Sequence, residues 1–160
     1  MNAQIDEEYD HARLLKGAWA VGQLLQYPLW EYRATIPAAV DAITTVMDEV
    51  LEGGEQTECF KGKELEVETA LREALANAVI HGGKNDERQW VHVSVSCDRN
   101  NEVKMVVRDS CYGFDPKSVP DPTLGQNLLA THGRGLFLIR QFMDEVRHER
   151  GGTEIFMRKR

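Results

Sequence analysis

Two stretches with alternating apolar residues constrain the fold most strongly. Valine or cysteine recurs at every second position from Val91 to Cys97, and a similar alternation returns from Val103 to Val107, beyond the polar segment Asp98 to Glu102. Side chains of a β-strand point alternately to its two faces, so each run predicts a strand with one buried face. The short polar connection predicts that the two strands pair as an antiparallel hairpin.

Helical spacing and glycine or proline breaks predict the elements before this hairpin. A short strand fits Glu31 to Ile36, and Pro37 is well placed as the first residue of a helix that ends at Gly53-Gly54. The charged stretch Glu55 to Glu64 predicts a loop. A second helix follows this loop and ends at Gly82-Gly83.

The C-terminal part predicts a third helix and two more strands. The helix runs from Gly135 to about Met143, and the strands lie near Glu145 to Glu149 and Thr153 to Arg158, joined at Gly151-Gly152. A sheet with one apolar face needs a second layer to bury that face. We therefore predict an α/β fold with two layers, an α/β sandwich in which a mixed, mostly antiparallel sheet is covered by helices on one face.

Size and charge limit the function of the chain. Its 160 residues, with 42% hydrophobic content, are enough for one domain with a core of its own. The formal net charge of −7 and the pI near 5.2 argue against direct binding to nucleic acid, because attraction to phosphate needs a basic patch. No apolar run approaches the length of a membrane span and the acidic N-terminus is unlike a signal peptide, so we expect no membrane association and a cytoplasmic location.

The cysteines lead to the same expectation. Cys59, Cys97 and Cys111 have no spacing typical of a metal site and no obvious disulfide scheme. This usage suits a reducing compartment.

The sequence EALANAVIHGG carries a polar pair one helical turn apart. Glu73 and Asn77 share a face of the helix, whereas Leu71, Leu75 and Val79 recur at the spacing of a core-facing stripe. The carboxylate could accept a proton from an attacking hydroxyl, and an amide oxygen is a ligand type that Mg²⁺ accepts. Taken alone, the spacing also fits an ordinary surface pair.

Two further positions suggest polar ligands. Asp109 falls at the end of the second hairpin strand, where an unpaired buried charge would be unfavourable, so the residue predicts a polar partner. Gly133 and Gly135 flank Arg134 where the third helix begins. Free backbone N–H groups and the helix dipole could face phosphate at that point.

Three separated segments, EALANAVIHGG, VVRDSCYGFDP and HGRGLFLI, together resemble the N, G1 and G2 boxes of the GHKL (Bergerat-fold) ATPases. Within that superfamily, the short chain and the sequence GRGLFLIRQFMDEV look most like the anti-sigma-factor serine/threonine-protein kinases. The resemblance covers about Tyr32 to Arg160. It implies a GHKL-type ATP-binding kinase domain over residues 32–160, which leaves residues 1–31 as an N-terminal extension. Helical spacing within that extension fits either a helix packed on its own domain or an arm that binds a partner.

The resemblance implies ATP and Mg²⁺ as cofactors and assigns roles to single residues. Glu73 would be the catalytic base and Asn77 the Mg²⁺ ligand. Asp109 would bind the exocyclic amine of adenine, assisted by the hydroxyl of Thr153. The implied cofactor-binding positions are Asn77, Asp109, Gly113, Gly133, Arg134, Gly135 and Thr153.

The implied function is that of an anti-sigma-factor kinase. It would phosphorylate a serine or threonine of an anti-anti-sigma (STAS-type) protein and regulate a sigma factor by partner switching, as a homodimer. One departure leaves an alternative open: the pattern D-x-G-x-G has Cys111 at its first glycine. A nucleotide-gated binding module without kinase turnover would fit this departure. The long segment Asp115 to His132 is expected to be either a lid ordered by phosphates and Mg²⁺ or a loop packed permanently on the sheet.

Overall fold

The computed structural model describes residues 28–110 and 134–160. The helical pattern before Tyr27, the expected lid, Cys111, Gly113 and Gly133 therefore lie outside the described residues.

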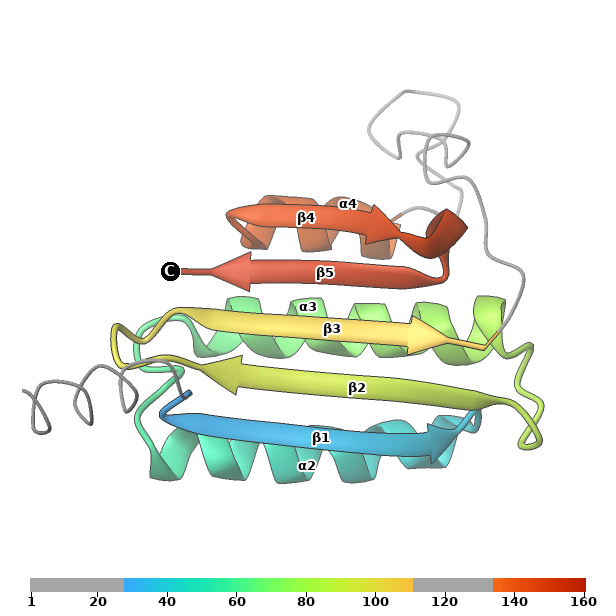
Figure 1. Cartoon of the computed structure of the whole chain (residues 1–160), viewed down its shortest axis with the longest axis horizontal. Helices are drawn as coiled ribbons and strands as arrows, with labels where there is room; N and C mark the ends of the chain where they lie inside the picture. The colour runs from blue at the N-terminus through green and yellow to red at the C-terminus, as the bar shows by residue number, and fades with distance from the viewer. Residues whose placement is uncertain (1–27, 111–133) are drawn as a thin grey trace, which may run out of the picture.

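The described part is a five-stranded sheet with helices behind one face (Figure 1). The strands lie in the order β1 (Trp30–Pro37), β2 (Trp90–Cys97), β3 (Val103–Asp109), β5 (Glu154–Lys159) and β4 (Glu145–Glu149). The helices are α2 (Val40–Gln56), α3 (Glu64–Ala76) and α4 (Arg134–Phe142). This confirms the α/β sandwich and the β2–β3 hairpin. All four described strand pairings are antiparallel, so no parallel pairing is found among them.

The alternation that predicted the hairpin places its apolar residues in the core. Val91, Val93 and Val95 of β2 are buried on the helix side, as are Met105 and Val107 of β3. Both α2 and α3 cover these residues with apolar side chains. The buried contributors from the two helices are Val46, Met47, Val50, Val67, Leu71 and Leu75.

The predicted start of α2 was wrong by three residues. Pro37 is the last residue of β1 and pairs with Trp90 of β2, while the helix begins at Val40. Proline is tolerated there because β1 is an edge strand, so its missing N–H removes no bond from the sheet interior. The chain is then anchored by Ala38, whose N–H donates to the carbonyl oxygen of Gln89 at 2.9 Å.

The predicted end of α2 was also wrong. The helix continues through Gly53 and Gly54 to Gln56. A Cβ atom at Gly53 would lie 2.5 Å from the indole of Trp30, and one at Gly54 would overlap the ring of Phe60. The two rings meet edge to face, with centroids 5.8 Å apart. These glycines admit aromatic side chains to the helix surface, and they do not terminate the helix.

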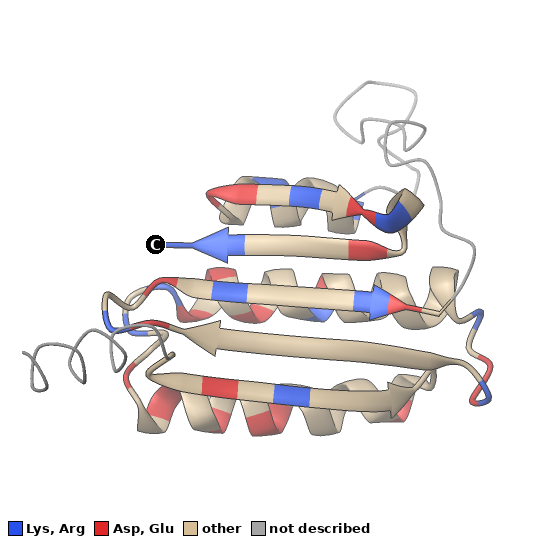
Figure 2. Cartoon of the chain, viewed as in Figure 1, with Lys and Arg blue, Asp and Glu red and all other residues tan. Residues whose placement is uncertain are grey.

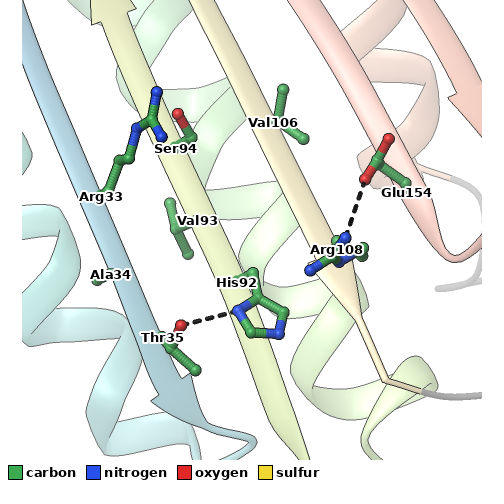
Figure 3. Close-up of a pocket in the computed structure, with 9 residues that line it drawn as sticks. All are labelled: Arg33, Ala34, Thr35, His92, Val93, Ser94, Val106, Arg108 and Glu154. Atoms are coloured by element: carbon green, nitrogen blue, oxygen red, sulfur yellow. Dashed lines mark hydrogen bonds and ion pairs between the residues drawn. The ribbon is translucent and has the colours of Figure 1, made fainter.

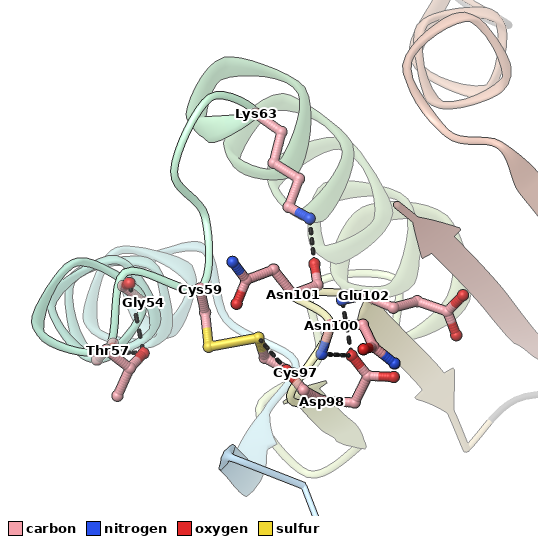
Figure 4. Close-up of a disulfide and its surroundings, with 10 residues drawn as sticks. Gly54, Thr57, Cys59, Lys63, Cys97, Asp98, Asn100, Asn101 and Glu102 are labelled. Carbon is pink, nitrogen blue, oxygen red and sulfur yellow. Dashed lines mark hydrogen bonds between the residues drawn. A yellow bond between two sulfur atoms is a disulfide. The ribbon is translucent and has the colours of Figure 1, made fainter.

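A disulfide corrects the expectation that the cysteines are unpaired. Cys59, after α2, is bonded to Cys97 at the end of β2 (Figure 4). Their Cα atoms are 6.0 Å apart, within the usual range for a disulfide, and both residues are fully buried. The partners are 38 positions apart, and spacing alone does not reveal such a pairing. The cysteine content therefore gives no support for a reducing compartment.

Charge is distributed unevenly over the two layers (Figure 2). Helix α2 carries Asp41, Asp48, Glu49, Glu52 and Glu55 and no lysine or arginine. The face of the sheet away from the helices, called here the open face, carries charges of both signs, among them Arg33, Arg108 and Glu154. No helix in the described ranges is long and apolar enough to cross a membrane.

Candidate functional site

Glu73 and Asn77 lie where α3 changes its helical geometry. Glu73 is in the last turn of the α-helix, and Asn77 begins the π-helical segment η1 (Asn77–Gly82). Both side chains are half-buried. Segments of π-helix are rare and often occur at functional sites. The predicted one-turn spacing of the pair is therefore retained, and the helix widens directly after it.

The N-terminal turn of α4 meets Glu73. A Cβ atom at Gly135 would overlap Oε2 of Glu73, so the carboxylate fills the space beside this glycine. The first N–H groups of a helix have no partner within the helix, and its dipole makes this end positive. Arg134, the first residue of α4, is exposed. The structure thus joins the first and third of the sequence segments.

Asp109 and Thr153 are neighbours at one end of the sheet. The backbone N–H of Asp109 donates to the carbonyl oxygen of Thr153 at 2.9 Å, just beyond the last β3–β5 pair. The hydroxyl of Thr153 donates to the carbonyl oxygen of Arg150 at 3.0 Å. Its oxygen can still accept a hydrogen bond from a ligand.

Segment η1 links the Asp109 end to the Glu73 end. Its last residue, Gly82, lies against Asp109, because a Cβ atom there would be 2.5 Å from Cγ of the carboxylate. Gly82 is nine positions after Glu73 along continuous helical backbone, which places the two on the order of 10 Å apart along the axis, since the α-helical rise is about 1.5 Å per residue and the wider π-helical part rises less. An elongated ligand could therefore contact one carboxylate at each end.

The strand end that carries Asp109 is held by a residue that sequence reasoning missed. The Ser110 hydroxyl accepts a hydrogen bond from the backbone N–H of Trp90 at 3.2 Å and donates to Oε1 of Gln89 at 2.9 Å. No pattern in the sequence signals this role. The contact between Gly82 and Asp109 was also missed, because the glycine pair was interpreted only as the end of a helix.

The protein oxygen atoms at this site could bind Mg²⁺ only if a bound ligand supplied further oxygen atoms. Within the described ranges, no group of three or more His, Cys, Asp or Glu side chains could hold a metal ion. Mg²⁺ is commonly bound through one or two protein oxygens, with water and phosphate oxygens completing the shell. The side-chain oxygen of Asn77 fits such a role, whereas a site built from protein ligands alone does not fit these residues.

A separate depression lies on the open face of the sheet (Figure 3). It has a volume of about 480 Å³ and contains none of the predicted site residues. Within it, Thr35 is hydrogen-bonded to Nδ1 of His92 at 2.7 Å, and Arg108 lies 4.0 Å from Glu154. Its lining residues are Arg33, Ala34, Thr35, His92, Val93, Ser94, Val106, Arg108 and Glu154.

Comparisons with known proteins indicate the family of this chain. A family model described as a histidine kinase-like ATPase domain matches residues 36–159. An anti-sigma F factor of Geobacillus kaustophilus (strain HTA426) is 30% identical over 132 residues, which cover 79% of this chain and 80% of the relative. An anti-sigma F factor of Priestia megaterium is 26% identical over 137 residues, with the same coverage.

A solved structure supports the fold. The RsbU and RsbW domains of a Mycobacterium tuberculosis protein match with a TM-score of 0.59 at 21% identity, over 83% of this chain. The match covers 33% of that longer chain, and at 21% identity the likeness concerns the fold alone. The family match over residues 36–159 and the 30% identity to the anti-sigma F factor of Geobacillus kaustophilus show that the chain belongs to the histidine kinase-like (GHKL) ATPases and, among them, to the anti-sigma-factor kinase family.

Proposed function

We propose that this chain is an ATP- and Mg²⁺-dependent serine/threonine kinase that phosphorylates an anti-anti-sigma protein of the STAS type. Phosphorylation would control whether the chain binds that antagonist or a sigma factor. One observation carries the proposal: Glu73 lies beside the start of α4, and Asn77, one turn later, begins the segment η1, whose last residue, Gly82, lies against Asp109.

The two ends of the site would hold the two ends of the nucleotide. The Asp109 carboxylate would accept a hydrogen bond from the exocyclic amine of adenine, with the Thr153 hydroxyl as a second polar contact. The N–H groups of Arg134 and Gly135 at the start of α4 would donate to phosphate oxygens. The family match supports nucleotide binding, and the contacts are inferred for these residues.

Glu73 would act on the hydroxyl of the protein substrate. Its carboxylate would accept the proton as the hydroxyl oxygen attacks, which raises the nucleophilicity of that oxygen. Asn77 would hold Mg²⁺, which when bound offsets charge on the phosphates of ATP. Both side chains are half-buried, so partial exclusion of water would strengthen these polar contacts.

Phosphate transfer tests the kinase proposal. The chain would be incubated with γ-labelled ATP and, one at a time, with purified STAS-domain proteins of the same organism. Replacing a general base lowers a rate by about 10²–10⁴-fold, so Glu73→Gln should abolish most transfer while retaining ATP affinity. Glu68→Gln is a matched control, because Glu68 is on the same helix but is ion-paired with Arg72 at 2.9 Å. Undiminished transfer by Glu73→Gln would refute the role of this residue.

A second candidate function is a nucleotide-gated binding module without kinase turnover. Cys111 in place of the first glycine of the D-x-G-x-G pattern favours it. Under this alternative, the chain would bind ATP and capture a sigma factor but transfer no phosphate during long incubation. Rapid, stoichiometric labelling of a STAS protein would exclude it.

Oligomeric state and domain organisation complete the proposal. The resemblance to anti-sigma-factor kinases supports a homodimer, a cytoplasmic location, and residues 32–160 as the kinase domain after an extension over residues 1–31. Light scattering coupled to size-exclusion chromatography would test the dimer. A pull-down with purified sigma factors, with and without ATP, would identify the partner.

A further inference from the structure

Gly82 lies directly against the side chain of Asp109. A Cβ atom on Gly82 would lie 2.5 Å from both Cγ and Oδ2 of Asp109 and 2.8 Å from its Cβ. Real Cβ atoms do not approach other heavy atoms that closely, so a side chain of any size at position 82 must displace the carboxylate or move the backbone.

Backbone conformation does not explain glycine at this position. Among the described glycines, positive φ angles occur at Gly62, Gly151 and Gly152, and Gly82 is not one of them. Gly82 instead closes η1, where glycine is less favourable than alanine by roughly 0.5–1 kcal/mol. Local structure would therefore accept alanine, whereas the neighbouring carboxylate does not.

The backbone of Asp109 is fixed from the other side. Asp109 is paired with Val91 of β2, and its N–H donates to Thr153 at 2.9 Å. Asp109 is two residues after Val107, so its side chain points to the helix side of the sheet, where η1 packs against β3. With the strand held in place, the width of the gap beside Gly82 determines where the carboxylate lies.

We propose that Gly82 is a positioning residue. Because it has no side chain, the Asp109 carboxylate can lie where it accepts a hydrogen bond from the exocyclic amine of adenine. The inference rests on the proposed nucleotide-binding function and adds a determinant of base specificity to it. A hydrogen bond to a charged acceptor depends steeply on distance and angle, so a displaced carboxylate would lose it. The expected loss is about tenfold to a hundredfold in affinity.

The ratio of the affinities for ADP and IDP distinguishes a positioning role of Gly82 from a general loss of structure. ADP and IDP differ at the purine 6-position, where IDP carries a carbonyl oxygen in place of the amine. Wild type should bind ADP at least about tenfold more tightly than IDP. Gly82→Ala should lower ADP affinity by about tenfold or more and change IDP affinity by less than about threefold, which removes the preference.

Gly83→Ala is the matched control. A Cβ atom at Gly83 would overlap the Cβ of Ala38, so this variant also crowds the end of η1, but none of the nearest atoms belongs to Asp109. It should retain the preference for ADP over IDP. A Gly82→Ala protein that keeps the wild-type preference, or a Gly83→Ala protein that loses it equally, overturns the positioning role.

A double-mutant cycle of unfolding free energies, measured without nucleotide, tests the proposal even if Gly82→Ala folds poorly. Urea unfolding would be compared for wild type, Gly82→Ala, Asp109→Ala and the double variant. Removing the carboxylate makes room for the new Cβ, so Gly82→Ala should destabilise wild type more than it destabilises Asp109→Ala. Equal destabilisation in both backgrounds overturns the proposal. A wild-type chain that binds neither ADP nor IDP, by contrast, overturns the proposed function and the recognition role that rests on it.

Discussion

Breaking the Cys59–Cys97 disulfide should markedly destabilise the fold. The bond connects the segment between α2 and α3 to the end of β2 (Figure 4). In the unfolded chain, it closes a loop between residues 38 positions apart. Reduction frees that loop, so the main effect should be a gain in entropy of the unfolded state.

The size of the effect follows from the loop length. In the chain-entropy relation, −2.1 − 1.5R ln n, linking residues 38 positions apart lowers the entropy of the unfolded chain by about 13 cal/mol/K. This corresponds to about 4 kcal/mol at 25 °C. With a urea m-value of about 2 kcal/mol/M, the unfolding midpoint should fall by about 2 M.

Urea unfolding of a Cys111→Ser variant, oxidised and reduced, measures this effect. The substitution leaves Cys59 and Cys97 as the remaining cysteines of the sequence. Thiol titration in denaturant should find no free thiols before reduction and two afterwards. Cys59→Ala/Cys97→Ala in the same background should unfold near the reduced protein. Two free thiols before reduction, or equal midpoints in the oxidised and reduced states, would refute the reasoning.

Three further substitutions test other contacts. Gly135→Ala should lower phosphate transfer at least about tenfold, because the new Cβ displaces the Glu73 carboxylate; transfer at the wild-type rate would contradict that contact. Gly53→Ala should lower the free energy of unfolding by about 1–3 kcal/mol, since the indole of Trp30 lies 2.5 Å from the new Cβ, whereas helix propensity alone predicts stabilisation. Burial lowers the pKa of His148 below its ordinary value, and the charge of Arg140 lowers it further. As pH falls below about 6.5, the unfolded chain therefore takes up a proton before the folded chain does. Stability should therefore decrease from pH 7 to pH 5.5, and His148→Gln should reduce that slope; an unchanged slope in urea unfolding at the two pH values would contradict the effect of burial.

The sequence predicted the elements in which each residue pattern has one structural meaning. Period-two alternation from Val91 to Cys97 can bury one face only in a strand, and the hairpin followed from it. The last two strands and α4 were predicted for similar local reasons. The one-turn spacing of Glu73 and Asn77 also survived, because both lie on one helical stretch.

The features that the sequence did not predict depend on contacts between distant residues. Glycine has the same local signature at a helix end and at a close approach, so the sequence alone does not show that Gly53 and Gly54 make room for Trp30 and Phe60. The same ambiguity concealed the contact of Gly82 with Asp109. Which cysteines pair is likewise decided by the tertiary fold.

The most direct test of the nucleotide site is a crystal structure of the chain with Mg²⁺ and a non-hydrolysable ATP analogue. We predict that the adenine amine lies within hydrogen-bonding distance of the Asp109 carboxylate and that the side-chain oxygen of Asn77 binds the metal. The phosphates should lie beside Glu73 and the start of α4. An analogue bound elsewhere, for example in the open-face depression lined by Arg33 and His92, or bound with its base away from Asp109, would contradict the assignment of this site.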